Sequence, residues 1–547
     1  MAVYDSAPVV ASAPRTRSVE VRRAREGSRS SILASAVSVV ALAAGIGLRL
    51  WRPDLAQANF DEANVASLVA AWKYQGAFPL AGTVSSYGFR AGQGWPWLAA
   101  LGLLWTDDPY ALIGAGLAAG ICGLVACWWV ARRWLGAWGG AAAALFNATA
   151  FYCVLLDRGA WLPVFLQAPM ALCLDAILRL AVQRRPWALV VACGWLGVLV
   201  SLHYTAVAFA IVVGVAMWHA RSVLRPGHAA AALVAGILPV TPLLVHEVNA
   251  TVHLRDLSDL LGLGGGGASV DLDTVVSTVQ VASTQGAAGL GGHAAGDLAA
   301  ALGRWTSLSL LGPVLAAAGL VVAIMRRPGG ATGWLLAAWT LAPILAFVRH
   351  GAPVIFHYMY IEFPGLALAT GALAAWAANS RFRAVRAGVG LAIGTYACAS
   401  ALSMLVLLGA LDRLDMSAGY GVPVGYSREA GRAARGFLPA GGQVLIGDDP
   451  HSAEVLRFSL GYSVASRSFE DCREVPIEAN AIYLLASERT PGATALDSAG
   501  ARLLARIARP GGDAYRVYAA PPTAASLEVR ARPSDPICQD RLVWDGP

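Results

Sequence analysis

Long apolar runs separated by short polar segments make up most of the chain. A helix needs about 20 apolar residues to cross the hydrocarbon core of a bilayer, and about eleven runs approach or exceed that length. The first is too long and too far from the start for an ordinary cleaved signal peptide, so we interpret it as a retained span. The gap between the fifth and sixth runs is very short. The predicted spans are about 31–50, 109–131, 135–155, 160–180, 186–202, 203–220, 229–247, 305–325, 331–348, 354–377 and 387–411.

Arginines occur at every second junction between these runs. Cytoplasmic loops of membrane proteins collect Arg and Lys, so the alternation predicts that the N-terminus lies inside the cytoplasmic membrane and the C-terminus outside. An error of one span would break the alternation. The basic junctions contain Arg15, Arg17, Arg22, Arg23, Arg25, Arg132, Arg133, Arg179, Arg184, Arg185, Arg221, Arg225, Arg326, Arg327, Arg381, Arg383 and Arg386.

This orientation divides the chain into three parts. We predict a basic cytoplasmic tail (1–30), a membrane domain (31–411) and an outer C-terminal domain (412–547). Two long outer loops, 51–108 and 248–304, interrupt the membrane domain. The second contains a glycine run that lacks the Lys-Ser/Thr ending of a phosphate loop, so we expect a flexible loop there.

The C-terminal region alternates short strand-like and helical segments, which is typical of a small α/β domain. Cys472 and Cys538 would lie in an oxidising compartment. There they could form a disulfide or stay as two free thiols, and the sequence favours neither alternative. The segments predict strands at Gln443–Ile446, Ala481–Leu485 and Tyr515–Tyr518 and helices at Arg428–Phe437 and Ala499–Ala508.

Composition supports a mainly α-helical polytopic membrane protein. The chain is 57% hydrophobic and 14% charged, whereas soluble proteins carry about 25% charged residues, and its mean hydropathy is +0.56. The net charge of +7 is spread over short clusters between spans, which indicates membrane topology and not nucleic-acid binding.

The acidic pair Asp61 and Glu62 opens an amphipathic segment in the first outer loop. Apolar residues then recur at helical spacing, so a helix that can lie in the membrane interface is expected. In the simpler interpretation Asp61 is the N-cap and Glu62 favours the positive end of the helix dipole. In the functional interpretation a carboxylate at the mouth of a membrane cavity acts as a base. The recurring apolar residues are Val65, Leu68, Val69 and Trp72.

Further ionisable residues gather at the predicted outer ends of the spans, where polar groups are costly and often functional. Arg158 and Arg349 could bind a phosphate through their planar donors or simply pair with a neighbour such as Asp157. A lone interfacial histidine is more often structural. The outer residues are Asp107, Asp108, Asp157, Arg158, His203, His246, Glu247, Arg349, His350, His357, Tyr358 and Glu362.

The order of several short motifs resembles the bacterial family 39-like glycosyltransferases, membrane enzymes of the C-type (GT-C) fold related to protein O-mannosyltransferases and aminoarabinose transferases. The resemblance covers most of residues 31–377. Each motif alone is weak evidence for the family, and the resemblance rests on the order of the motifs along the chain. The motifs are Phe60-Asp-Glu-Ala63, Ser85-Ser-Tyr-Gly88, Trp95-Pro-Trp97, Thr106-Asp-Asp-Pro109, Leu156-Asp-Arg158, Trp161-Leu-Pro163, Ser201-Leu-His203-Tyr204-Thr205, Pro242-Leu-Leu-Val-His-Glu247 and His357-Tyr358 with Pro364.

The resemblance implies transfer of a sugar from a polyprenyl-phosphate carrier to a glycan, lipid or protein acceptor outside the cytoplasmic membrane, with inversion. It places the general base at Asp61 and gives Glu62 a supporting role. A divalent metal could assist, but no ligand set stands out. Relatives often show Ser-Arg where this chain has Asp157-Arg158. Candidate ligands of the donor phosphate are Arg158, Arg349, His203, His357 and Tyr358; Asp107, Asp108, Glu247 and Glu362 are further site candidates.

Two other classes of protein fit the same sequence. A transporter or flippase for a lipid-linked glycan should show repeated halves and a site near the bilayer midplane; we see no clear repeat. A non-catalytic scaffold would bind cell-wall glycan through its C-terminal domain and would tolerate Asp61→Asn. A transferase would lose sugar transfer with that substitution. For a transferase, Asp61 should open into a cavity shared with Arg158 and His357.

Overall fold

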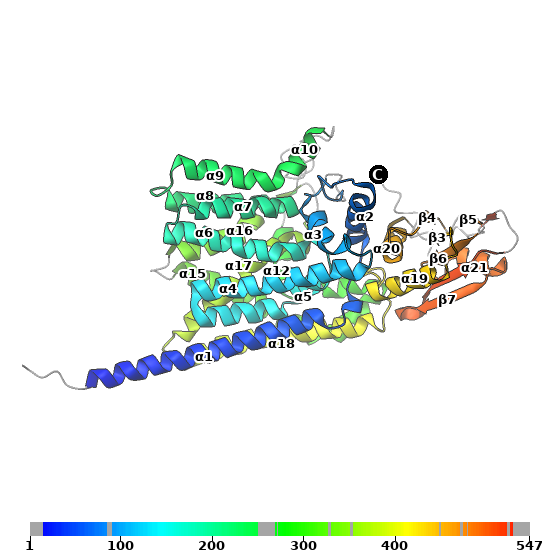
Figure 1. The fold of residues 1–547 in the computed structure, drawn as a ribbon. Coiled ribbons are helices and arrows are strands. Elements are labelled where there is room, and N and C mark those ends of the chain that lie inside the picture. Colours follow the sequence, from blue (N-terminus) through cyan, green and yellow to red (C-terminus); the bar gives the residue numbers. More distant parts are fainter. Residues whose placement is uncertain are drawn as a thin grey trace, which may run out of the picture.

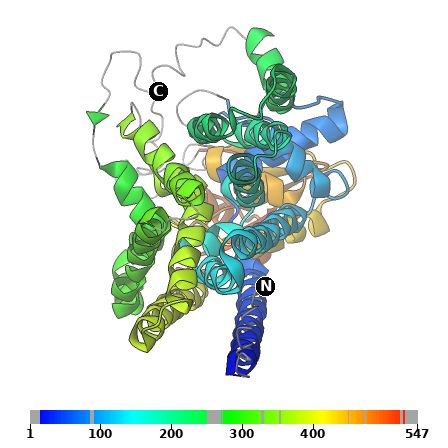
Figure 2. The same ribbon diagram turned by 90° about the vertical axis from the view of Figure 1, so that its left-hand side faces the viewer.

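The chain folds into a bundle of long helices with a small sheet at one end (Figure 1). The first helix begins at the opposite end of the bundle from the sheet (Figure 1), as expected for an odd number of membrane crossings. Figure 2 shows the bundle end-on, with the N-terminal helix towards the viewer. The computed structural model describes residues 15–84, 90–249, 269–270, 272–325, 330–350, 354–447, 450–470, 474–478, 480–521 and 526–528.

Apolar helices of membrane-spanning length form the bundle. Within the described residues, seven are long and apolar enough to cross a membrane, and three more are apolar but shorter. The long ones are α1 (Arg15–Leu50), α4 (Pro109–Thr149), η2 and α6 (Leu162–Leu166, Gln167–Gln183), α9, η4 and α10 (Pro226–Ile237, Leu238–Val240, Thr241–Asn249), α14 and α15 (Arg304–Ser309, Leu311–Met325), η6 and α17 (Phe356–Glu362, Phe363–Ala378), and α18 (Arg383–Leu411). The shorter ones are α7 (Ala188–Leu202), η3 and α8 (Tyr204–Ala208, Phe209–Ala220), and α16 (Gly330–Phe347).

Helix α4 supplies two of the predicted spans because it turns back on itself. Its 41 residues contain one non-helical position, Gly136, with a φ of 81°. A side chain at Gly140 would collide with Arg132, so the segments on either side of the turn lie close together. Glycine adopts such a positive φ without steric cost. With α4 counted twice, the seven long and three shorter apolar helices of the described residues number eleven, which equals the predicted number of spans.

Arginines at several inter-helix turns lie over aromatic rings. The guanidinium of Arg133 is 5.5 Å from the ring centre of Trp129, and that of Arg221 is 4.4 Å from Trp218. Arginine beside tryptophan is typical of the boundary between membrane and water. These contacts mark where the described spans end, while the assignment of that boundary to the cytoplasmic side stays a prediction.

Short helices of the outer loops lie between the bundle and the sheet. In the first loop, η1 (Pro53–Leu55) precedes α2 (Phe60–Gln75), which packs against α3 (Gly94–Leu103) and against α20 (Pro450–Leu460). The apolar face predicted for α2 is therefore covered by protein: Val65 and Val69 are buried. The second loop contains β1 (Ser269–Val270), α12 (Asp273–Val281), η5 (Ala287–Ala294) and α13 (Ala295–Leu302), and β1 pairs with β2 (Arg349–His350).

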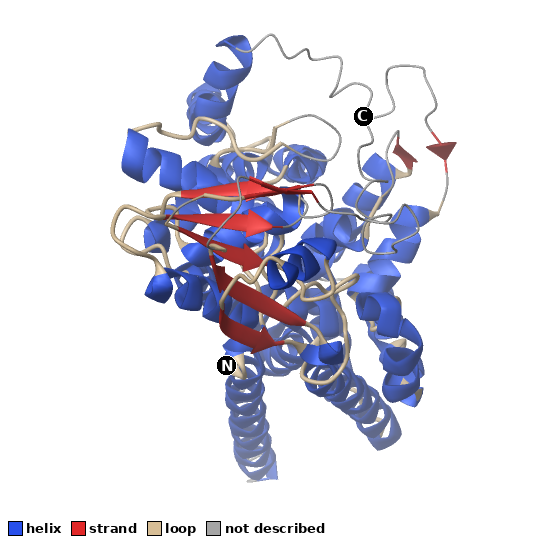
Figure 3. Cartoon of the chain, turned by 90° about the vertical axis from the view of Figure 1, so that its right-hand side faces the viewer, coloured by secondary structure: helices blue, strands red, loops and turns tan. Residues whose placement is uncertain are grey.

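The C-terminal region is the expected α/β unit, and Figure 3 shows its sheet in front of the helix bundle. The strand order is β4-β3-β6-β8-β7, in which β3 runs parallel to β4 and β6 while β8 is antiparallel to β6 and β7. The strands are β3 (Gln443–Gly447), β4 (Ser466–Phe469), β6 (Ala481–Leu485), β7 (Leu503–Ala508) and β8 (Ala514–Ala519); β5 (Glu474–Pro476) pairs separately with β9 (Ser526–Glu528).

Alternating side chains bury both faces of this sheet. Val444 and Ile446 join a core with α19 (Val424–Phe437) and α20, whereas Leu445 between them joins a core with α21 (Pro491–Ser498) on the other face. This alternation follows from the two-residue period of a strand. The result is a three-layer arrangement of helices, sheet and helix.

One predicted C-terminal helix is wrong. Residues 499–508 are not helical; Leu503–Ala508 forms β7, the edge strand, and the helix α21 precedes it. The segment is rich in Ala, Leu and Arg, which favour helices. Pairing with β8 outweighs that preference, because strand formation depends mainly on tertiary packing.

Candidate functional site

A capping box fixes the start of α2, directly before the acidic pair. Asn59 is the N-cap, and the side chain of Glu62 accepts a hydrogen bond of 2.9 Å from the Asn59 backbone N–H. This reciprocal arrangement satisfies amide groups that the first turn of a helix leaves unpaired. The expectation that Asp61 is the N-cap is wrong: the cap lies two residues earlier, and Glu62 serves it.

The carboxylate of Asp61 is therefore not needed for capping. The indole N–H of Trp161 donates a hydrogen bond to its Oδ2 atom over 3.0 Å. Trp161 stands just before η2, at the outer end of the α6 span. A carboxylate held in one orientation by a neutral donor keeps its negative charge and its second oxygen for another partner.

Burial raises the pKa values of both carboxyl groups. The Trp161 hydrogen bond partly offsets the rise for Asp61. Glu62 is 1% exposed, and burial together with the neighbouring Asp61 charge raises its pKa to about 8. At neutral pH Glu62 therefore carries a proton for most of the time, whereas the Trp161 hydrogen bond favours the charged form of Asp61.

A row of rings leads from Asp61 to two of the predicted histidines. The ring of His357 lies 4.3 Å from that of Trp161 and 4.2 Å from that of Tyr358. Tyr358 lies 5.7 Å from His203, which stacks on Tyr204 at 4.7 Å. Chain segments far apart in sequence thus bring four predicted site residues together with Trp161. We call these five residues the Asp61 row: Asp61, Trp161, His203, His357 and Tyr358.

The two histidines differ in how they are held. His203 shares a hydrogen bond of 2.6 Å between its Nδ1 atom and the Thr205 hydroxyl. The Nδ1 atom of His357 is buried and has no hydrogen-bond partner among the described residues. A buried polar atom without a partner is unfavourable, so His357 is the member of the row most suited to receive a ligand.

Arg158 is engaged with backbone and not directed at this row. Its guanidinium donates to the carbonyl oxygens of Leu48 (2.8 Å) and Arg52 (2.7 Å), and also to that of Trp51. These carbonyls stand at the end of α1, where a helix leaves its last acceptors unpaired. Arg158 therefore caps α1, while its Nε atom has no hydrogen-bond partner among the described residues, and its role as a phosphate ligand stays a prediction.

Asp157 pairs with Arg49 and not with Arg158. The two side chains are fully buried, with 2.6 Å between an Arg49 nitrogen and Asp157 Oδ2. Arg49 also donates to the carbonyl of Gly45, and Gln167 donates to Asp157. No motif in the sequence predicts this cluster, although a charged residue inside an apolar run is a signal for it. The Arg49 cluster consists of Arg49, Asn147, Cys153, Asp157, Gln167 and Tyr360.

The acidic pair before α4 attaches the outer segments to one another. Asp107 accepts from Lys73 over 2.8 Å, and this ion pair with the Tyr74 hydrogen bond lowers its pKa although partial burial opposes the change. Asp108 is the N-cap of α4 through the Tyr110 N–H. It also forms an ion pair with Arg428 of α19. The two predicted site candidates Asp107 and Asp108 thus hold neighbouring segments of the fold together.

Glu362 is buried beside the second outer loop. The hydroxyl of Thr278 on α12 donates to its Oε2 atom over 2.9 Å, and its Oε1 atom has no partner among the described residues. Arg349 lies in β2 opposite Val270, but its side chain is outside the described part of the structure, as is that of Glu247. Cys472, Cys538, Ser85–Gly88 and the glycine run 262–267 also lie outside the described residues.

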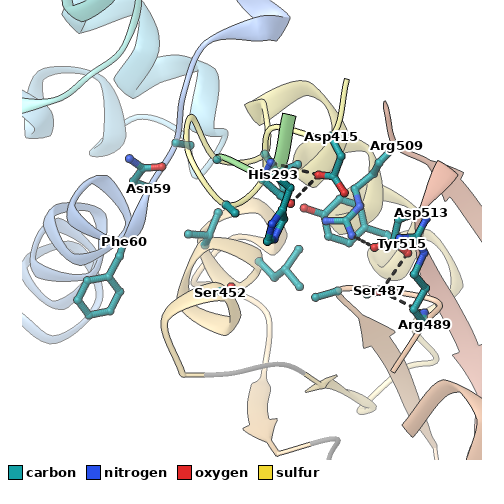
Figure 4. Close-up of a pocket in the computed structure, with 18 residues that line it drawn as sticks. Asn59, Phe60, His293, Asp415, Ser452, Ser487, Arg489, Arg509, Asp513 and Tyr515 are labelled. Atoms are coloured by element: carbon teal, nitrogen blue, oxygen red, sulfur yellow. Dashed lines mark hydrogen bonds and ion pairs between the residues drawn. The ribbon is translucent and has the colours of Figure 1, made fainter. Parts of the chain in front are cut away.

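A cavity of about 600 Å³ lies beside the start of α2, between the outer loops and the C-terminal sheet (Figure 4). Asn59 and Phe60 form one wall. Asp61, Arg158 and His357 do not line it, so this is not the shared cavity that the sequence predicted. Within the described residues no group of three or more His, Cys, Asp or Glu side chains could hold a metal ion.

The architecture is that of the C-type membrane glycosyltransferases, as the motif order predicted. The solved structure of ArnT from Cupriavidus metallidurans bound to undecaprenyl phosphate has a TM-score of 0.53 at 14% sequence identity, covering 89% of this chain and 97% of that one. The apo state of the same protein has a TM-score of 0.52 at 14% identity, covering 90% and 98%. At this identity the likeness shows the fold alone. No family model and no curated protein matches the chain.

Proposed function

We propose that this protein is a membrane glycosyltransferase that moves a sugar from a polyprenyl-phosphate carrier to an acceptor on the outer side of the cytoplasmic membrane. The observation that carries the proposal is the placement of Asp61. Its carboxylate accepts a hydrogen bond from Trp161, and Glu62, not Asp61, completes the capping box of the helix. Ring contacts from Trp161 through His357 and Tyr358 lead to His203. A similar structure, ArnT, is described bound to undecaprenyl phosphate, which is the kind of carrier we propose here.

The reaction needs little covalent chemistry from the protein. An acceptor hydroxyl oxygen attacks the anomeric carbon while the bond from that carbon to the phosphate oxygen breaks. Asp61 takes the hydroxyl proton as general base. The electron pair of the broken bond leaves with the polyprenyl phosphate. Direct displacement from the opposite side inverts the anomeric centre.

Groups along the Asp61 row are the proposed contacts of the departing phosphate. The Tyr358 hydroxyl and the imidazoles of His203 and His357 can donate hydrogen bonds to phosphate oxygens. Fixed donors placed where charge develops contribute most when water is excluded. Arg349 is kept as a further candidate because β2 directly precedes the segment that carries His357.

The proposal is tested by sugar transfer in proteoliposomes. Purified full-length protein is reconstituted with undecaprenyl phosphate carrying one of a panel of radiolabelled hexoses or pentoses, and membrane and cell-wall extracts supply acceptors. Transfer of label and release of undecaprenyl phosphate are measured. Asp61→Asn keeps the volume of the side chain but removes the base, so transfer should fall by about 10²–10⁴-fold.

Asp107→Asn is the matched control. Asp107 is another outer carboxylate, but its partners are Lys73 and Tyr74, so this variant should retain transfer. Full activity of Asp61→Asn would show that the base is assigned wrongly. Movement of the intact lipid-linked sugar across the bilayer, without loss of its phosphate bond, would favour the transporter class instead.

A further inference from the structure

The cavity beside α2 carries polar groups that the proposed reaction does not use. We propose that it binds a neutral, hydroxyl-rich glycan segment of the acceptor, an inference that rests on the proposed function. Its volume of about 600 Å³ lies within the roughly 300–1,000 Å³ typical of small-molecule sites. The polar lining residues are Asn59, His293, Asp415, Ser417, Ser452, Ser487, Arg489, Arg509, Asp513 and Tyr515.

The sheet side of the cavity is held in place by its own contacts. Arg509 forms an ion pair with Asp513, and its guanidinium lies 4.7 Å from the ring centre of Tyr515. Asp513 in turn accepts 3.0 Å and 3.1 Å hydrogen bonds from the Ser487 hydroxyl and the Glu488 N–H. An arrangement already fixed before binding loses less conformational entropy when a ligand arrives.

One donor on this wall is unused. The Nε atom of Arg509 is buried and has no hydrogen-bond partner among the described residues, while the Arg509 side chain is 13% exposed. Arg509 and Asp513 flank η7 (Pro510–Gly512), the turn between β7 and β8. Figure 4 shows their side chains on the opposite side of the cavity from Asn59 and Phe60.

The charges in the cavity balance. Arg489 and Arg509 supply two positive charges, and Asp415 and Asp513 supply two negative ones. The lining therefore offers an anionic ligand no net attraction, because the two carboxylates oppose the pull of the two arginines. Sugar hydroxyls both donate and accept hydrogen bonds, so a neutral glycan matches a lining of mixed donors and acceptors.

The position of the cavity relates it to the proposed base. Asn59 and Phe60 form its wall on α2, and Asp61 follows directly in the chain. A glycan held in the cavity thus lies at the same end of α2 as the carboxylate that would accept its proton. The C-terminal sheet therefore contributes the opposite wall of the acceptor site.

The test is binding of labelled tetrasaccharides to the full-length protein in lipid nanodiscs. Mannotetraose, maltotetraose and cellotetraose are the neutral probes, and tetragalacturonic acid is the anionic one. Ser417→Trp places a bulky ring in the cavity from a position that is exposed. It should weaken binding of the preferred neutral probe by about tenfold or more, because the ring occupies the volume of the ligand.

Ser498→Trp is the matched control, since Ser498 is exposed on α21 and does not line the cavity. It should bind as the wild type does. Asp415→Asn removes one carboxylate acceptor without adding bulk and should weaken the neutral probe while improving the anionic one. Melting temperatures close to that of the wild type establish that each variant is folded.

Three results would overturn the glycan site: equal binding by Ser417→Trp and Ser498→Trp, preference of the wild type for the anionic probe, or absence of binding by every probe. Asp61→Asn separates this proposal from the reaction. That variant should bind the neutral probe normally and lose transfer. If it binds and also retains transfer, the catalytic assignment fails while the glycan site stands.

Discussion

Two polar clusters at the end of the bundle nearest the sheet differ in how fully their hydrogen-bonding groups are used. In the Arg49 cluster every buried side-chain donor and acceptor has a partner within the described residues, and Arg49 and Asp157 are both inaccessible to solvent. In the Asp61 row, Asp61 has one side-chain donor, Trp161, and His357 Nδ1 has no partner among the described residues.

The difference separates polar groups that hold the fold from those left available for a ligand. A buried ion pair with complete hydrogen bonding fixes one arrangement of helices but has nothing to offer a substrate. An incompletely paired row costs stability and leaves a buried atom, His357 Nδ1, without a partner among the described residues. Polarity at membrane depth is thus insufficient to identify a site; the number of unused donors and acceptors distinguishes the two clusters.

The largest effect on stability is expected from breaking the Arg49 cluster. Arg49→Met leaves Asp157 buried without its cation, and removing one partner of a buried pair costs about 3–5 kcal/mol. The melting temperature of the protein in detergent should fall accordingly. The double variant Arg49→Met/Asp157→Leu should recover part of the loss. Equal melting temperatures for wild type and Arg49→Met would contradict the structural role.

A smaller effect is expected at Glu62, where the carboxyl group closes the capping box. Glu62→Ala removes the acceptor for the Asn59 N–H and should cost about 1 kcal/mol. Glu62→Gln keeps an oxygen acceptor of similar size and serves as its control. Thermal unfolding of both variants near neutral pH measures the difference, and a larger loss in Glu62→Gln would contradict the cap.

Glu62 also predicts a dependence of stability on pH. Its pKa of about 8 in the folded protein lies above its ordinary value, so the folded state binds the proton more tightly. Its contribution to stability is complete below the ordinary pKa and is lost as the pH rises through about 8. Glu62→Gln should therefore reduce the fall in melting temperature between about pH 5 and pH 9.

Trp161→Phe should move the pH dependence of transfer more modestly. The indole hydrogen bond stabilises the Asp61 carboxylate and opposes the rise in pKa caused by burial. Without this hydrogen bond the pKa of Asp61 rises further. A larger fraction of the protein then has a protonated Asp61, which cannot act as a base, at acidic pH. The acid limb of the rate profile should shift to higher pH. An unchanged acid limb would mean that Asp61 is not the titrating base.

The smallest effect is expected at an exposed ion pair. Arg52 pairs with Asp54 and Asp412, and its side chain is 41% exposed. Such pairs contribute about 0–1 kcal/mol. Arg52→Met should change the melting temperature little and leave transfer intact. A fall in melting temperature as large as that of Arg49→Met would contradict the expectation that buried charges matter more for stability than exposed ones.

Most of the fold could be predicted from the sequence because membrane crossings need long apolar runs. The close gap at 202–203 was resolved correctly, since α7 ends at Leu202 and η3 begins at Tyr204. The positive φ at Gly136 could not be foreseen, but its consequence, two spans in place of one, followed from Arg132 and Arg133 at the turn. The edge strand β7 was missed because its sequence favours a helix.

The candidate site was only partly predictable. Asp61, His203, His357 and Tyr358 were identified from motifs, and the structure brings them together. The role of Arg158 depended on a partner about 110 residues away, the end of α1, which no local pattern reveals. Arg49 stood inside a predicted span and was overlooked, because its partner is likewise distant in sequence.

The Asp108 carboxylate restricts how the outer sheet can move. It caps α4 and also binds Arg428 on α19, so tilting the sheet away from the bundle would separate Arg428 from a carboxylate that stays fixed to α4. A hinge at this point is therefore unfavourable. The proposed acceptor would then reach the cavity beside α2 while the sheet keeps this position.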